Sequence, residues 1–116
     1  MNKVYVYSKC NTCRNALKWL KEKGLNAELI NIDSNPPTIN EIRKYHIMSG
    51  KPLKSFFNTS GMVYRELNLK GRIDQLDEEE LYKLLSSNGM LIKRPLLIFD
   101  NKILIGFKEK QWETIL

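Results

Sequence analysis

An apolar run, Val4–Tyr7, leads directly into a polar turn that holds two cysteines, Cys10 and Cys13, in C-x-x-C spacing. Apolar side chains then recur at helical spacing from residue 16 to residue 20, so a helix is expected to begin inside the turn. Cys10 is therefore predicted to lie at the mouth of a helix, just past the end of a strand. Unpaired N–H groups and the positive end of the helix dipole favour a thiolate there over a thiol. Such sites lower the cysteine pKa below its free value of ~8.5.

The two cysteines are predicted to act in sequence. Cys10 lies nearer the loop and is the expected exposed nucleophile of low pKa. Cys13 lies one turn deeper and is the expected resolving thiol. The alternative is that both are small buried hydrophobic side chains, as cysteines often are. The strand–turn–helix context favours the redox role, and the neighbouring Arg14 is expected to face solvent.

The first third of the chain predicts a β-α-β unit. Its helix should end near Lys23, before Gly24, with Asn11 or Thr12 as the N-cap. A second strand is expected over residues 27–32. A C-x-x-C pair at the first turn of such a unit is typical of thioredoxin-like redox proteins.

The middle of the chain, approximately residues 36–90, predicts helices and turns. Thr38 and Glu41 have the spacing of a capping box, and Gly50 is placed to end that helix. An acidic stretch, residues 77–80, should begin a later helix that buries Leu81, Leu84 and Leu85 and ends at Asn88-Gly89.

The last quarter predicts a hairpin and a closing helix. Lys93–Phe99 is expected as a buried strand, turned at Asp100-Asn101 into a strand over 102–105. A helix over 108–116 should point Trp112 inward. The expected fold is therefore α/β, a thioredoxin-like (glutaredoxin-like) mixed sheet with a helical insertion between βαβ and ββα, in one domain over residues 1–116.

Composition limits the classes of function. The longest apolar run, Pro95–Phe99, is far too short to cross a membrane. The first residues do not have the basic-then-apolar pattern of a signal peptide, because polar residues follow Val4–Tyr7 at once. We expect a cytoplasmic protein, in which a permanent disulfide is disfavoured. The net charge of +6 suits small anionic or thiol substrates, but the basic residues are spread along the chain, so direct nucleic-acid contact is not expected. One C-x-x-C and one histidine, His46, do not supply four zinc ligands, so no metal is expected.

Two other features have both a functional and a plain interpretation. Pro95 has no backbone N–H, so it would remove a hydrogen-bond donor from a central strand. It is tolerated if the strand begins at Pro95 and the preceding bond is cis. In that case Arg94 would be presented to the cysteine pocket. A guanidinium binds oxyanions bidentately, whereas the alternative is a strand-start proline after a surface arginine. His46 is expected to be a core or boundary histidine rather than a partner of Cys10. The segment Tyr64–Leu67 could line the pocket.

Four segments together carry a resemblance to a known family: Tyr7–Arg14, Asn58–Leu67, Gly89–Leu96 and Gly106–Glu109. On these motifs the chain resembles the ArsC/Spx family over essentially its full length, and it is most similar to the short ArsC-like members. The combination is far more specific than a C-x-x-C pair alone.

The resemblance implies roles for particular residues. Cys10 aligns with the catalytic cysteine of glutaredoxin-linked arsenate reductases, Arg94 with an anion-binding arginine, and Pro95 with the cis-proline. Lys108 corresponds to a further arginine, and Asn58 stands where those reductases carry another. In those reductases the thiolate attacks arsenate, and glutathione and glutaredoxin supply electrons without a bound cofactor. They use a single active-site cysteine, whereas this chain also has Cys13.

Two functions follow from the residues and the resemblance. In the first, the chain is a thiol–disulfide oxidoreductase: Cys10 attacks an oxidised or oxyanionic substrate, arsenate included, and Cys13 or glutathione resolves the adduct, with glutaredoxin or thioredoxin as partner. The alternative is an Spx-like regulator, in which the cysteine pair switches binding to the C-terminal domain of the RNA polymerase α subunit, near Gly50. Spx proteins continue into a basic tail that this sequence lacks, which favours the enzyme.

Overall fold

Four short strands form one mixed sheet in the computed structural model, which describes residues 2–116. They are β1 (Lys3–Val6), β2 (Glu28–Asn31), β3 (Leu96–Phe99) and β4 (Lys102–Ile105), in the order β2-β1-β3-β4. β1 runs parallel to β2 and antiparallel to β3, and β3 and β4 form an antiparallel hairpin. The α/β class and the mixed sheet predicted from the sequence are confirmed.

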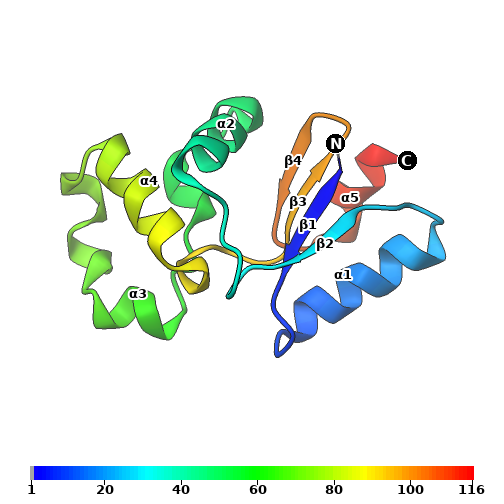
Figure 1. Ribbon diagram of the computed structural model, residues 1–116, viewed down its shortest axis with the longest axis horizontal. Coiled ribbons are helices and arrows are strands. Elements are labelled where there is room, and N and C mark those ends of the chain that lie inside the picture. The colour runs from blue at the N-terminus through cyan, green and yellow to red at the C-terminus, as the bar shows by residue number, and fades with distance from the viewer. Residues whose placement is uncertain (1) are drawn as a thin grey trace.

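Helices cover both faces of this sheet (Figure 1). Helices α1 and α5 lie on one side, and α2 and α4 lie on the other, with α3 beyond them. The α-helices are α1 (Asn11–Glu22), α2 (Ile39–Ser49), α3 (Met62–Glu66), α4 (Glu78–Ser87) and α5 (Glu109–Trp112). Short 3-10 turns lie at Leu53–Phe56, Leu69–Gly71, Ile73–Gln75, Gly89–Leu91 and Glu113–Ile115. No helix within residues 2–116 is long and apolar enough to cross a membrane.

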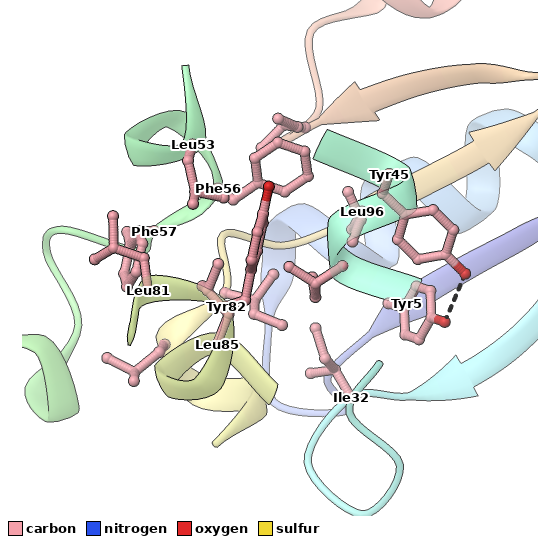
Figure 2. Close-up of a cluster of buried hydrophobic side chains, with 14 of the residues drawn as sticks. Tyr5, Ile32, Tyr45, Leu53, Phe56, Phe57, Leu81, Tyr82, Leu85 and Leu96 are labelled. Carbon is pink, nitrogen blue, oxygen red and sulfur yellow. Dashed lines mark hydrogen bonds between the residues drawn. The ribbon is translucent and has the colours of Figure 1, made fainter. Parts of the chain in front are cut away.

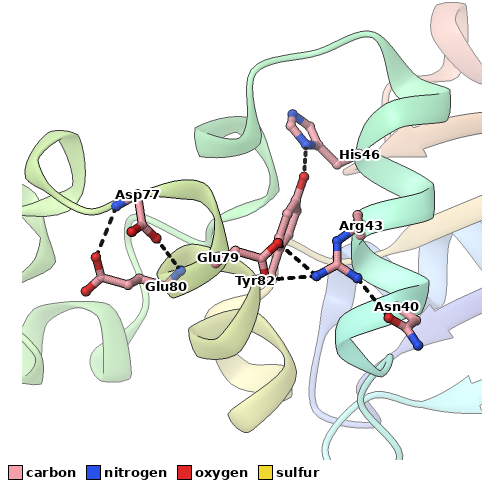
Figure 3. A network of polar contacts seen from close by, with 7 residues as sticks. All are labelled: Asn40, Arg43, His46, Asp77, Glu79, Glu80 and Tyr82. Atoms are coloured by element: carbon pink, nitrogen blue, oxygen red, sulfur yellow. Dashed lines mark hydrogen bonds and ion pairs between the residues drawn. The ribbon is translucent and has the colours of Figure 1, made fainter.

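Local side-chain chemistry sets the ends of α2 and the start of α4, and the capping box and glycine end of α2 were predicted from the sequence. Thr38 Oγ1 accepts a hydrogen bond from the N–H of Glu41 at 3.1 Å, and the Glu41 carboxylate accepts one from the N–H of Thr38 at 2.9 Å. Asp77 and Glu80 form the same reciprocal capping box at the start of α4 (Figure 3). Gly50 ends α2 in the left-handed conformation, with φ 63°, which a residue without Cβ adopts at no steric cost.

The core has one part on each face of the sheet. On the side of α1 and α5, Trp112 is fully buried and its indole N–H donates to the carbonyl of Gly106 at 3.0 Å. On the side of α2 and α4, aromatic and aliphatic side chains fill the layer, and the hydroxyls of Tyr5 and Tyr45 lie 3.1 Å apart (Figure 2). Full burial of each large apolar side chain stabilises the fold by roughly 1.5–3 kcal/mol.

Several details differ from the sequence-based expectation. The strand expected over Lys93–Phe99 begins only at Leu96, because Pro95 has no N–H for the sheet. The second strand is an edge strand, shorter than residues 27–32, and its Leu29 is 57% exposed. In α4, Tyr82 is buried beside Leu81 and Leu85, whereas Leu84 is only partly buried. The closing segment is α-helical only to Trp112 and then tightens into a 3-10 turn. The exposure of a side chain in an edge strand, and the change from α-helix to 3-10 turn at a helix end, depend on which other elements pack nearby. The periodicity of the sequence does not show these contacts. The division into one domain with a helical insertion over 36–90 stays a prediction.

Candidate active site

Cys10 is the N-cap of α1, directly after the loop that leaves β1. Its backbone is extended, with φ −112° and ψ 113°, and its Sγ accepts a hydrogen bond from the backbone N–H of Cys13 at 3.2 Å. The expectation that Asn11 or Thr12 caps this helix was wrong, because both residues already belong to its first turn. Cap preferences rank asparagine and threonine highly, but a thiolate in the same position satisfies the same N–H group. The cap therefore places a sulfur at the positive end of the helix dipole.

The surroundings shift the two cysteine pKa values in opposite directions. Partial burial would raise the pKa of Cys10, but hydrogen bonding from Cys13 and the positive charge of Arg94 outweigh it, so the pKa lies below its ordinary value. Burial, followed by hydrogen bonding to Cys10, raises the pKa of Cys13 to about 12. Cys13 is 1% exposed and Cys10 is partly exposed. At neutral pH the accessible sulfur is thus the one stabilised as a thiolate.

Cys10 opens onto a cavity of about 400 Å³. Residues from four separate parts of the chain line it: Cys10, Thr12, Asn58, Ser60, Lys93, Arg94, Ile105, Gly106, Phe107 and Lys108. β1 and β3 are antiparallel neighbours, so the end of β1 lies beside the start of β3. The residues that begin α1 and the residues before β3 therefore meet at the same end of these two strands. The loop that follows Phe57 is held close because the Asn58 N–H donates to the carbonyl of Leu91 at 2.7 Å.

Arg94 reaches this cavity with its positive charge unneutralised by any described carboxylate. Its guanidinium carbon lies 5.4 Å from the centre of the Tyr7 ring, and Nη1 approaches the carbonyls of Met90 and Ile92 at 3.4 and 3.5 Å. Its Nε is buried without a hydrogen-bond partner, and no ion pair involves Arg94 within residues 2–116. A buried donor without a partner is uncommon. Arg94 also lines the cavity without an ion-pair partner among the described residues, which suits its guanidinium to bind an anion there.

The predicted site residues are largely brought together. Cys10, Arg94 and Lys108 line the same cavity, and Cys13 lies buried one turn behind Cys10. Pro95 follows a cis peptide bond as the sequence suggested. It is buried rather than lining the cavity, and its carbonyl accepts the N–H of Gly106 at 2.8 Å, which holds the Gly106–Lys108 wall in position.

Sequence reasoning missed Lys93 and Ser60 as lining residues of the cavity. Lys93 was visible only as part of the basic pair with Arg94, and nothing in its spacing indicated that it turns toward Gly106. Its Cε lies 3.1 Å from the position that a Cβ at Gly106 would occupy. Glycine at position 106, with φ +74°, therefore lets the lysine stem pass close to the backbone.

Other candidate residues lie elsewhere. His46 is on α2, where its Nδ1 lies 2.6 Å from the Tyr82 hydroxyl (Figure 3), so the boundary role is confirmed. Arg14 is exposed, as predicted, and its guanidinium donates to Asn11 Oδ1 and to the carbonyl of Ser8. Tyr64, in the segment considered as a pocket lining, lines a neighbouring cavity instead.

Known proteins with similar sequences and structures were found for nearly the whole chain. A model of the ArsC family matches residues 5–115. The chain is 51% identical over 109 residues to the uncharacterized protein YusI of Bacillus subtilis, covering 94% of this chain and 92% of that protein. It is 30% identical over 108 residues to the global transcriptional regulator Spx of Enterococcus faecalis, covering 93% and 80%.

The fold is also similar to that of solved structures. The crystal structure of a possible arsenate reductase from Streptococcus mutans UA159 matches with a TM-score of 0.89 and 44% identity, covering 97% of this chain and 98% of that one. Together with the mixed sheet, this match confirms the predicted thioredoxin-like fold and the predicted resemblance.

Proposed function

Because the chain belongs to the ArsC family, we propose that it is a thiol–disulfide oxidoreductase in which the Cys10 thiolate attacks an oxidised or oxyanionic substrate. One observation carries the proposal. Cys10 faces a cavity beside Arg94, which has no ion-pair partner among the described residues, and the N–H of Cys13 donates to the Cys10 sulfur. This arrangement stabilises negative charge on the accessible sulfur and keeps the deeper one protonated.

The reaction with a disulfide proceeds in two exchanges. The Cys10 thiolate attacks one substrate sulfur, a Cys10–substrate disulfide forms, and the leaving thiolate takes up a proton. Cys13 then loses its proton and attacks Cys10 Sγ, which releases the second substrate thiolate and leaves a Cys10–Cys13 disulfide. The two cysteines supply both electrons. Glutathione can replace Cys13 as the second thiol, and glutaredoxin or thioredoxin would return the protein to its reduced form.

An oxyanion would use the same nucleophile. Arg94 and Lys108 supply positive charge in the cavity, and Asn58 supplies an uncharged polar group. Arsenate is a candidate because the Streptococcus mutans protein of 44% identity is described as a possible arsenate reductase. The thiolate would form a sulfur–arsenic bond with loss of water. A second thiol would then attack Cys10 Sγ, so that sulfur is oxidised and arsenic leaves reduced by two electrons.

A single-turnover experiment tests the oxidoreductase. Reduced protein is mixed with the uncharged disulfide 2-hydroxyethyl disulfide, and the products are separated by mass. We expect the wild type to end as the intramolecular disulfide, Cys13→Ser to stop at the Cys10 mixed disulfide, and Cys10→Ser to remain unmodified. A Cys10→Ser protein that still forms the mixed disulfide, or that retains glutathione-linked arsenate reduction, would eliminate the proposed nucleophile.

A second candidate is an Spx-like regulator that binds the C-terminal domain of the RNA polymerase α subunit. The 30% identity to Spx over 93% of the chain supports it, and Gly50 lies exposed at the end of α2. Capture of the isolated α C-terminal domain is compared between the reduced protein, the oxidised protein and Gly50→Arg. Redox-dependent capture that is lost in Gly50→Arg would favour the regulator over the enzyme alone, whereas no capture in either state counts against it.

A further inference from the structure

A second cavity adjoins the one at Cys10. It has a volume of about 710 Å³ and lies along α3 and the turn after it, lined by Thr59, Ser60, Tyr64, Arg65, Asn68, Leu69 and Lys70. Ser60 lines both cavities, so the two meet at the loop before α3. Each cavity falls within the size range of about 300–1,000 Å³ that is typical of ligand sites. A small oxyanion at Cys10 leaves the α3 cavity unused.

The charges along these two cavities have one sign. Lys93, Arg94 and Lys108 line the first, and Arg65 and Lys70 line the second. No aspartate or glutamate is among the residues that line either cavity, and none of these five cations forms an ion pair within residues 2–116.

Three cations outside the cavities are neutralised by carboxylates. Lys3, Arg43 and Lys54 each lie within 4 Å of a carboxylate: Lys3 3.4 Å from Glu41, and Arg43 and Lys54 each 2.8 Å from their partners. What distinguishes the two adjoining cavities is that five cations and no carboxylate line them, so positive charge is concentrated there. Such a surface favours an extended anionic ligand rather than a neutral one.

We propose that the α3 cavity binds the acidic flank of a peptide whose oxidised cysteine sits at Cys10, so that the substrates are disulfides in acidic protein segments. This proposal rests on the proposed function, since it deepens the same site. A peptide is favoured over a nucleic acid because the reactive group in the cavity is a sulfur nucleophile, and peptides carry the disulfide sulfur that it attacks. Threonine, serine and asparagine side chains between the cations supply uncharged groups suited to peptide N–H and C=O groups.

The chemical step is the first exchange described above. The Cys10 thiolate forms a bond to the peptide sulfur, the disulfide within the substrate breaks, and the leaving thiolate takes up a proton. Arg65 and Lys70 take no part in bond making. They lower the free energy of the encounter by attracting carboxylates that flank the peptide cysteine, so their effect should weaken as salt rises.

The experiment compares three disulfides made from short peptides and a chromogenic aromatic thiol. One peptide has four glutamates beside its cysteine, one has glutamines and one has lysines. The rate constant for release of the aromatic thiol by reduced Cys13→Ser protein is measured at low and high salt. We expect the acidic peptide to react roughly tenfold faster than the glutamine peptide at low salt. This ratio should fall toward one in Arg65→Gln/Lys70→Gln and be restored in Arg65→Lys/Lys70→Arg.

Lys18→Gln/Lys21→Gln is the matched control, because it removes the same charge from exposed positions on α1. It should keep the preference for the acidic peptide. An equal loss in this control, or an unchanged ratio in Arg65→Gln/Lys70→Gln, would overturn the proposed subsite.

Binding without chemistry separates this proposal from the proposed function. A fluorescent acidic peptide with serine in place of cysteine should bind the wild type, measured by anisotropy, at least threefold more tightly than Arg65→Gln/Lys70→Gln. If the wild type reacts with none of the disulfides, the proposed function fails, and this measurement still decides the subsite. Tighter binding of a single-stranded oligonucleotide than of the acidic peptide, lost in the same variant, would assign the surface to nucleic acid and overturn the proposal.

Discussion

The backbone N–H of Cys13 donates a hydrogen bond to Sγ of Cys10 over 3.2 Å. Three positions apart on one helix turn, the residues have different surroundings, since Cys10 faces a cavity and Cys13 is buried. The contact makes the sulfur of Cys10 the cap of α1 and a better thiolate at the same time. A single local geometry thus places an accessible sulfur of lowered pKa beside a buried sulfur of raised pKa.

Alkylation of the wild type should show one reactive cysteine. Because only the thiolate reacts, the rate of iodoacetamide modification should rise with pH through the Cys10 pKa, with a midpoint below the ~8.5 of a free cysteine. Cys13, whose pKa is raised to about 12, should not react between pH 5 and pH 9. Mass analysis identifies the labelled residue. A midpoint at or above that of a free cysteine would show that Cys10 is not activated.

Arg94→Gln should make Cys10 less reactive. The substitution removes a positive charge that lowers the Cys10 pKa, so the alkylation midpoint should move to higher pH and the rate at pH 7 should fall roughly threefold to tenfold. Arg14→Gln is the matched control, because Arg14 is exposed and contacts Asn11 and Ser8 rather than the sulfur. Equal effects of the two substitutions would mean that Arg94 acts only through net charge.

Trp112→Phe should destabilise the wall of the cavity. The buried indole N–H donates to the carbonyl of Gly106, and phenylalanine would leave that carbonyl without its donor at a cost of about 2 kcal/mol in the free energy of unfolding. Urea unfolding measures this loss. Trp19→Phe is the comparison, since Trp19 packs edge-on against Trp112 at 5.9 Å and forms no side-chain hydrogen bond in the described chain. It should cost less than Trp112→Phe.

Gly89→Ala should destabilise the fold strongly. A Cβ at Gly89 would overlap the carbonyl oxygen of Ile32, which is backbone and cannot rotate away. The required shift should cost about 3 kcal/mol or more of unfolding free energy. Gly71→Ala has open space at its Cβ and an ordinary φ, so it should change stability by less than about 0.5 kcal/mol. Equal stability of the two variants would contradict this close approach.

Much of the local structure was predictable because it depends on residues close together in the chain. The Thr38–Glu41 and Asp77–Glu80 boxes join residues three apart, and the hairpin turn at Asp100-Asn101 has both residues at positive φ. The apolar periods of the strands and of α1 likewise indicated the sheet and its first helix.

The sequence by itself determined that a cysteine pair begins a helix after a strand, because hydrogen bonding and periodicity are local. Only the tertiary structure decided what faces Cys10. Asn58, Lys93 and Lys108 reach it through the pairing of β1 with β3 and the loop anchored at Leu91, contacts between residues far apart in the chain. It also decided that Cys10 rather than Asn11 caps α1, since cap preference ranks residue types while the loop leaving β1 fixes which residue occupies the cap.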